Sequence, residues 1–256
     1  YKVMTYNIRL DVASDGENTW NFRKDHVLGL LQFYEPDIFV IQEGLLHQVH
    51  YLDSLLQKYS VIGQGRDGGQ NGEQSAIFYN ENIFEVEESN TFWLSDTPEK
   101  VSKGWDAQLN RMCTYALFEN KKTKEVFWVF NTHLDHFGEI ARVKSVQLIH
   151  EMIETKNKKK HPVVIMGDLN AEPGSNPVKF LNEKYLNSKK EAILVYNDTG
   201  TFNGFDFFKP VTAEIDYIFF SKHKIAVKKY AVLTDSYSCK YPSDHFPVMV
   251  EFEITK

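Results

Sequence analysis

Short apolar runs rich in β-branched and aromatic residues recur along most of the chain. Every run is followed by a polar or charged residue, as is typical of strands that end in turns. The pattern predicts a protein rich in strands. The expected strands cover residues 3–8, 38–42, 75–79, 112–119, 126–132, 163–167, 215–220 and 248–254.

Between some of these runs, apolar residues recur every three or four positions, which is the spacing of one helix face. Helices are therefore expected to flank the strands. A lysine-rich run, residues 156–160, follows the last helical pattern and is expected to be a solvated helix end, where cations are favourable. The helical positions are Val27, Leu30, Leu31 and Tyr34; Val49, Leu52, Leu55 and Leu56; and Ile140, Val143, Ile149 and Ile153.

The organisation of the chain favours one domain. Its 256 residues can form a single large core. No solenoid repeat or low-complexity linker interrupts it, and the Gly- and Asn-rich stretch 63–72 reads as a loop within a domain. We therefore predict a single α/β domain over residues 1–256.

Composition narrows the function classes only slightly. With 29 basic and 35 acidic residues the formal net charge is −6, and no basic tail is present, so strong nonspecific attraction to nucleic acid is not expected. Cys113 and Cys239 are too few for a disulfide framework or a structural zinc site, although one disulfide stays open. No apolar run has membrane-spanning length. The first residue, Tyr1, is compatible with a processed, exported form, and no compartment is predicted.

Polar residues stand where the predicted strands end. That edge of an α/β sheet is where ligands bind, because a strand end holds a side chain rigidly and leaves it accessible. One such residue is more often a turn cap than a functional group, but a recurrence along the chain favours a site. The residues are Asn7, Glu43, His133, Asp168, Asn170, Asp216, Asp244 and His245.

Oxygen ligands dominate this set, which favours a hard cation. Magnesium takes few protein carboxylates and keeps waters that a substrate phosphate can displace, so Mg²⁺, or Mn²⁺, is the expected metal. Zinc is the competing interpretation, because His133, Asp135 and His136 lie close together in the sequence. Their spacing in an extended or turning segment does not aim all three side chains at one point, and His136 is expected to be a loop or supporting residue.

His245 and Asp216 are candidates for water activation. A carboxylate that binds one imidazole nitrogen fixes the tautomer and raises the basicity of the other nitrogen. A Ser-His-Asp triad is disfavoured, since Ser243 merely precedes the Asp244–His245 pair and no G-x-S-x-G elbow is present. No Walker-type phosphate loop occurs either.

Six segments, in this order and over nearly the whole chain, resemble the endonuclease/exonuclease/phosphatase superfamily: MTYNI, IQEG, NTHLDH, GDLNAEP, EIDYIFFS and SDHFPV. Within it, the chain is most similar to bacterial deoxyribonuclease-like metal-dependent phosphoesterases. The resemblance implies two mixed β-sheets packed face to face as a sandwich with flanking helices.

The resemblance also implies roles for the candidate residues. Asn7 and Glu43 would serve metal binding and phosphate orientation, with Asp244 near the metal. Asp168 and Asn170 would position the water and the phosphate, Asp216 would hold the base His245, and His133 would stabilise the phosphate or the leaving group. One departure is Arg9, which stands where abasic-site endonucleases have an aspartate, so their ligand arrangement is not carried over.

Three further residues are weaker candidates for substrate binding. Glu73 precedes a strand much as the acidic partner of the second active-site histidine does in the nuclease branch. Arg111 offers a planar fork to phosphate, with a structural ion pair as the alternative. Trp105 lies in a polar loop beside Gly104, whereas Trp93 in the same region is expected in the core.

Together these residues predict in-line attack on phosphorus by a water that His245 deprotonates, with Asp168 as an alternative proton acceptor. A metal-bound water or His133 would protonate the leaving group. The expected substrate is a small phosphorylated molecule or a short nucleic acid rather than long duplex DNA, because net −6 gives little help in binding successive phosphates. A duplex DNA endonuclease, a sphingomyelinase-like phospholipid phosphodiesterase and a non-catalytic scaffold are the alternatives.

Overall fold

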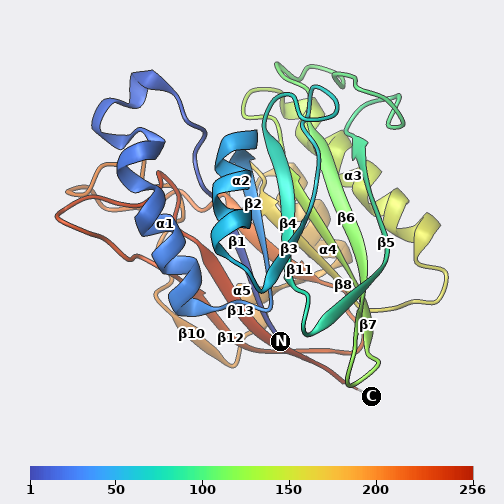
Figure 1. Cartoon of the computed structure of the whole chain (residues 1–256). Helices are drawn as coiled ribbons and strands as arrows, with labels where there is room; N and C mark the ends of the chain where they lie inside the picture. The colour runs from blue at the N-terminus through green and yellow to red at the C-terminus, as the bar shows by residue number, and fades with distance from the viewer. Residues whose placement is uncertain (256) are drawn as a thin grey trace.

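Two mixed β-sheets pack face to face, and helices cover their outer faces (Figure 1). The structure is a computed structural model that describes residues 1–255. The predicted fold class is confirmed.

The first sheet has seven strands. Strand β1 is parallel to β2 and antiparallel to β13, so the chain's beginning and end lie side by side in the sheet centre. In spatial order the strands are β10 (Leu194–Tyr196), β12 (Ile225–Val232), β13 (Val248–Ile254), β1 (Lys2–Asn7), β2 (Ile38–Gly44), β4 (Gln74–Asn80) and β3 (Tyr59–Ile62).

The second sheet has six strands. Its central pair, β7 and β8, is parallel, and its other pairs are antiparallel. In spatial order the strands are β5 (Phe84–Trp93), β6 (Met112–Asn120), β7 (Val126–His133), β8 (Val163–Asp168), β11 (Asp216–Phe220) and β9 (Leu186–Asn187).

Three apolar clusters hold these layers together. The central one lies between the sheets and joins residues such as Val40 of β2 to Val129 of β7 and Met166 of β8. Helices α1 and α2 cover the outer face of the first sheet, and α3 and α4 cover that of the second (Figure 1). The helices are η1 (a 3-10 helix, Ala13–Asn18), α1 (Trp20–Tyr34), α2 (Leu46–Leu55), α3 (Glu139–Lys156), α4 (Asn176–Lys184) and α5 (Ser188–Glu191).

The predicted elements are found with shifts of a few residues at their ends. The lysine-rich run lies at and beyond the end of α3, with Lys158 to Lys160 exposed, as expected. Strands β3, β5, β9, β10 and β12 and helices η1, α4 and α5 were not predicted. Cys113 and Cys239 are free thiols, so the open disulfide does not form. Among residues 1–255, no helix is long and apolar enough to cross a membrane.

The topology brings six chain segments to one end of the sandwich. Strands β1 and β2 of one sheet end together because they are parallel, and so do β7 and β8 of the other sheet; the 2.9 Å hydrogen bond from Asn7 to Asp168 shows that both pairs end at the same place. Strand β11, antiparallel to β8, begins there, and so does β13, antiparallel to β1. The residues at these strand ends are therefore neighbours in space.

Candidate active site

The predicted residues gather at that end of the sandwich and come from both sheets. Asn7 ends β1 and Glu43 is the second-to-last residue of β2, while His133 and Asp168 end β7 and β8. Register places His133 beside Asp168, and Asp168 opposite Asp216. The geometry of the site therefore depends on how the two sheets pack.

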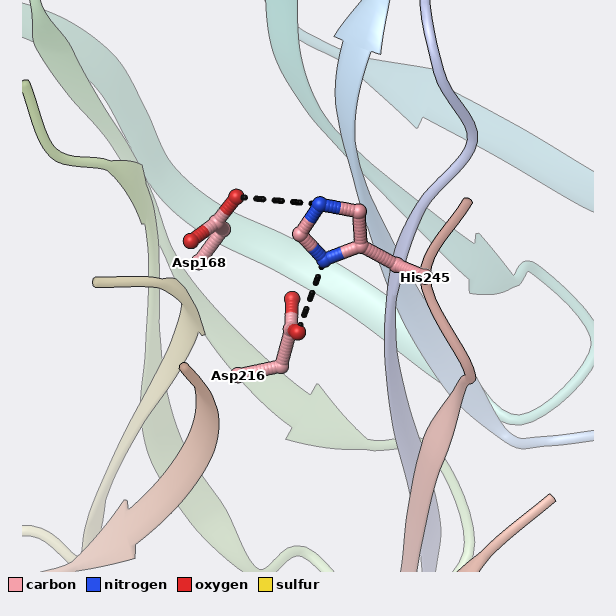
Figure 2. Close-up of side chains that lie close together, drawn as sticks. All are labelled: Asp168, Asp216 and His245. Atoms are coloured by element: carbon pink, nitrogen blue, oxygen red, sulfur yellow. Dashed lines mark hydrogen bonds and ion pairs between the residues drawn. The ribbon is translucent and has the colours of Figure 1, made fainter. Parts of the chain in front are cut away.

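His245 lies between two buried carboxylates (Figure 2). Its Nδ1 atom is 2.8 Å from Oδ2 of Asp216, and its Nε2 atom is 3.8 Å from Oδ2 of Asp168. The other oxygen of Asp216, Oδ1, has no hydrogen-bond partner among the described residues. One imidazole nitrogen is thus held by a carboxylate and the other faces a second one.

Burial and neighbouring charges shift the pKa values of His245 and Asp168. Burial alone lowers the pKa of His245, but the carboxylates of Asp216 and Asp168 raise it well above its ordinary value. Burial and the charge of Asp216 raise the pKa of Asp168 to about 7, against the opposing effect of His245. A proton near neutral pH is therefore held jointly by Asp168 and His245.

Asn7 links residues of the two sheets. Its Nδ2 atom donates to Oε1 of Glu43 at 3.1 Å and to Oδ2 of Asp168 at 2.9 Å, and lies 3.4 Å from Nε2 of His245. Its Oδ1 atom accepts the backbone N–H of Arg9. Asn7 was expected to bind metal or orient phosphate; its amide nitrogen contacts carboxylates, and its oxygen accepts one hydrogen bond and has a second lone pair.

Glu43 and Asp244 present carboxylate oxygens to one cavity. Arg9 lies between them, with Nη1 3.9 Å from Glu43 and Nε 3.7 Å from Asp244, and is itself held by Asp15 at 2.9 Å. Burial and the charge of Glu43 raise the pKa of Asp244, so Arg9 balances the negative charge only in part. This oxygen donor set fits Mg²⁺ or Mn²⁺.

A second group, Asp168, Asp216 and His245, could also hold a metal ion, since one ligand atom of each lies within 4.8 Å of the others.

In the zinc alternative, the side chains of Asp135 and His136 already have partners within the protein. Asp135 accepts hydrogen bonds from the backbone N–H groups of residues 108, 109, 137 and 138, and Nδ1 of His136 lies 3.1 Å from Arg111. Both side chains are thus engaged with the protein, which for His136 agrees with the expected loop or supporting role.

His133 and Asn170 lie beside Asp168. The Nδ2 atom of Asn170 is 3.0 Å from Nε2 of His133, which in turn is 3.5 Å from Asp168. Burial, together with the positive charge of Arg111, holds the pKa of His133 well below its ordinary value. His133 is therefore a neutral hydrogen-bonding group at neutral pH.

Three non-glycine residues of the site have left-handed backbone. The φ angles are 57° at Arg9, 62° at Glu43 and 46° at Asn170. At Glu43 the register between β2 and β4 also shifts, which marks a β-bulge. The backbone at these residues departs from regular strand geometry, in which side chains stand perpendicular to the sheet.

Gly167 permits the close approach of β7 and β8 beside the site. A Cβ atom on this residue would lie 1.9 Å from the carbonyl oxygen of Thr132, and its φ is 145°. The following residues, Asp168 and His133, are the paired ends of the two strands. The G-D sequence thus lets two site residues stand side by side.

The expected partnership of Glu73 with His133 is not found. Glu73 binds Arg66 instead, with 2.7 Å between Oε1 and Nη2, and burial raises the pKa of Glu73. Arg111 is buried and lies 3.5 Å from Asp135, which agrees with the ion-pair alternative. All of Glu73, Arg66 and Arg111 nevertheless line the same cavity as His133.

The two tryptophans occupy different settings. Trp105 donates its indole N–H to Asp96 at 3.1 Å and is not among the residues that line the cavity. Trp93 is buried, as expected for a core residue, and its indole N–H binds the carbonyl of Arg66 at 2.7 Å. Trp93 therefore positions a cavity residue, whereas Trp105 stays an untested prediction for substrate binding.

These residues enclose a cavity of about 380 Å³ at the end of the sandwich. Its wall is largely charged, with apolar side chains from Leu109 and Phe202 at exposed positions. Phe202 packs edge-on against His245, with ring centroids 5.0 Å apart. The sequence analysis missed Phe202, because one aromatic residue in an irregular loop carries no periodic signal.

Comparison with known proteins agrees with this geometry. The model of the Endonuclease/Exonuclease/phosphatase family matches residues 4–245. The mannosyl-6-phosphatase Bt3783 of Bacteroides thetaiotaomicron VPI-5482 is 39% identical, with 98% of each chain covered and a TM-score of 0.93. A family protein from Bacteroides vulgatus is 34% identical, with 99% of this chain and 98% of that chain covered and a TM-score of 0.93.

A more distant relative is human Nocturnin, 25% identical over all of this chain, which spans 65% of Nocturnin's length. The family match identifies the chain as a hydrolase of phosphoester bonds. Taken with the structural neighbours, it shows that the chain belongs to the endonuclease/exonuclease/phosphatase family.

Proposed function

We propose that this chain is a divalent-metal-dependent phosphatase that releases phosphate from a small phosphorylated sugar. The observation that carries the proposal is the buried Asp216–His245–Asp168 arrangement at a cavity of small-molecule size, with 2.8 Å and 3.8 Å between the facing atoms.

In the proposed mechanism, His245 is the general base. The hydrogen bond from Nδ1 to Asp216 leaves Nε2 facing the cavity, where it takes a proton from the attacking water. Because Asp168 and His245 together hold one proton near neutral pH, His245 acts as the base when that proton lies on Asp168, 3.8 Å away, and Asp168 is the proton acceptor when it lies on His245. The raised pKa of Asp168, about 7, suits this exchange near neutral pH.

Asn170 and His133 would act on the phosphate. Asn170 is held by two contacts of 3.0 Å, to His133 and to the carbonyl of Leu134, so its position is fixed before substrate arrives. Because His133 is neutral at neutral pH, it would serve as a hydrogen-bonding group and not as a cationic acid.

Glu43 and Asp244 would hold the metal, and Asn7 would orient Glu43. A bound Mg²⁺ or Mn²⁺ supplies neutralisation of the charge that develops on the phosphate oxygens. We favour this pair over the Asp168–Asp216–His245 group because the hydrogen bond between Asp216 and His245 already uses two ligand atoms of that group.

Two observations support a small substrate. The cavity has a volume of about 380 Å³, which suits a small molecule, and its wall includes the cations Arg9, Arg66 and Arg111. A relative with 39% identity over nearly the whole chain is named as a mannosyl-6-phosphatase. A hexose phosphate is therefore the first substrate to test.

The test compares initial rates on mannose 6-phosphate, other sugar phosphates, nucleotides, bis(p-nitrophenyl) phosphate, phospholipid vesicles, short single strands and plasmid DNA. All assays contain Mg²⁺ at matched low salt, with His245→Ala as the control for contaminating activity. We expect a sugar phosphate to be hydrolysed fastest, with little salt dependence.

Fastest cleavage of plasmid DNA, with a rate that collapses as salt rises, would instead establish a duplex nuclease with a local basic groove. Preference for phospholipid vesicles would establish the phospholipid alternative. No His245-dependent turnover of any phosphate ester would leave the non-catalytic scaffold.

A further inference from the structure

Arg23 is a fully buried cation whose hydrogen bonds all go to backbone carbonyl oxygens. It lies in the first turn of α1, outside the residues that line the cavity. Burying a charge without a carboxylate partner is costly, so an arginine here needs strong compensation from its contacts. The segments that Arg23 contacts are therefore the ones whose positions it fixes.

The guanidinium of Arg23 joins three segments of chain. It binds the carbonyls of residues 8, 9 and 10 just beyond β1, with 2.6 Å to that of Arg9. Its Nε atom binds the carbonyl of Asn18 at 2.7 Å, at the end of the η1 helix that carries Asp15. Its Nη1 atom binds the carbonyl of Pro242 at 3.2 Å, two residues before Asp244. Each segment thus leads directly to a side chain of the site.

Other contacts join the same parts of the chain. Ser243 donates from Oγ to the carbonyl of Asn7 at 2.7 Å, parallel to the link made by Arg23. The loop that contains Asn203 binds the segment from the other side, because Asn203 donates from Nδ2 to the carbonyl of Ser243. In that loop, the ring of Phe205 lies 5.7 Å from the Arg23 guanidinium carbon, and Trp20 lies 5.3 Å from it.

We infer that Arg23 is a positioning residue for phosphoester hydrolysis, which sets where the segment 242–245 stands relative to the end of β1. The distance that depends on it is the one between His245, on that segment, and Asn7, at the end of β1, which is now 3.4 Å. Because in-line attack tolerates little displacement of the base, a small shift of this segment lowers turnover without removing any group that contacts substrate. The inference rests on the proposed role of His245.

The substitution Arg23→Lys keeps the positive charge and removes the hydrogen-bonding geometry of the guanidinium, so it tests the two contributions separately. An ammonium keeps the positive charge, but a single nitrogen cannot reach the carbonyls of Asn18, Arg9 and Pro242, which the planar guanidinium binds through three different nitrogens. Arg23→Lys is therefore expected to lower kcat about tenfold to hundredfold. KM should stay within about threefold, because the residues that bind substrate remain.

The matched control is Leu181→Ala, which removes a buried side chain of α4 on the far face of the second sheet. Both variants lose stability, so kcat and KM are measured well below the lower of their Tm values. The inference requires that Arg23→Lys lose kcat while Leu181→Ala keeps it. A normal kcat in Arg23→Lys, or an equal loss in Leu181→Ala, would overturn it.

Ser243→Ala keeps the inference testable if Arg23→Lys does not fold. This variant weakens the parallel link between the same segments, so it too must lower kcat with KM nearly unchanged, and a normal kcat would count against the inference. Where both single variants fold, the double variant must deviate from the product of their effects, because the two links act on one pair of segments. A purely multiplicative result would contradict this.

A failure of the proposed function can be distinguished from a failure of the inference about Arg23. If wild-type turnover does not depend on His245, the mechanism is wrong whatever Arg23 does. If turnover depends on His245 and Arg23→Lys is fully active, only the inference about Arg23 is wrong.

Discussion

Asp216 and Asp168 stand directly opposite each other on the antiparallel strands β11 and β8, and both face the imidazole of His245. The sheet register therefore brings two carboxylates together at one buried place. Burial, and after it the like charge of Asp216, raises the pKa of Asp168 to about 7, and the two carboxylates raise the pKa of His245, so Asp168 and the imidazole share a proton.

Replacing His245 by alanine is expected to lower kcat by about a hundredfold to ten-thousandfold, because a general base acts in the transition state. Asp216→Asn should lower kcat in the same direction by loosening the imidazole. Steady-state kinetics on the preferred substrate, with folding verified by circular dichroism, measure both. A defect confined to KM in both variants would remove the base assignment.

Chelation by EDTA should abolish turnover, and Glu43→Gln should raise the Mg²⁺ concentration needed for half-maximal rate. The reason is the loss of one carboxylate charge from the oxygen donor set. Isothermal titration with Mg²⁺ or Mn²⁺ measures binding directly and independently of turnover. The exposed Glu99 supplies the control, since Glu99→Gln removes the same charge away from the cavity. Equal metal affinity in the two variants would exclude Glu43 as a ligand.

Asp135 should make acid stability depend on one side chain. Burial alone raises the pKa of Asp135, but hydrogen bonds from the backbone N–H groups of Gly138, Phe137 and Gln108 lower it to about 2. A depressed folded-state pKa stabilises the protein above the unfolded value of 3.8, and this contribution disappears as the pH falls toward 2.

The depression corresponds to roughly 2 kcal/mol at neutral pH, so Asp135→Asn should cost at least about that much in the free energy of unfolding. Urea denaturation at pH 7 and at several values below 4 checks this, with the exposed Asp53→Asn as control. The gap between wild type and Asp135→Asn should narrow as the pH falls below 4. A gap that stays constant would refute the assignment.

Gly167→Ala should destabilise the protein by about 3 kcal/mol, because its Cβ would meet the Thr132 carbonyl at 1.9 Å and its φ is positive. Gly174→Ala is the matched control, with φ 89° and no atom within 4 Å of the added Cβ. Left-handed backbone alone should cost about 1 kcal/mol there. Urea unfolding of both variants measures the difference, and equal losses would mean that β7 and β8 can separate freely.

The strands that carry the site could be predicted from sequence, because they are buried and each ends at a polar residue. Strands β2 and β8 show the pattern clearly, as apolar runs followed by Glu43 and Asp168. Strand β5 escaped prediction because it is an edge strand with exposed residues in its middle and a register shift at Val86. A second register shift, at Val227, breaks the alternation in β12.

Side-chain partnerships were less predictable than positions. Glu73 binds Arg66 across a glycine-rich loop that folds back on itself, and no periodic sequence pattern predicts that turn. Gln42 and Asn131 form a buried hydrogen bond of 2.8 Å between the two sheets, which exists only because the sheets stack in this register. The first contact depends on an irregular loop and the second on packing between distant segments, and short motifs encode neither.

At Arg9, Glu43 and Asn170, which have left-handed backbone, the residue that would be best for stability differs from the one that the proposed function needs. Such backbone costs Arg9 and Glu43 roughly 1 kcal/mol or more each, and costs Asn170 less because asparagine tolerates it. Glycine would relieve part of that cost while deleting a side chain of the proposed site. A directed-evolution campaign that screened only for heat resistance would therefore favour glycine at these positions, and under the proposed function it would return stable proteins with reduced activity. Libraries meant to toughen this enzyme should hold the three positions constant and draw their gains from elsewhere.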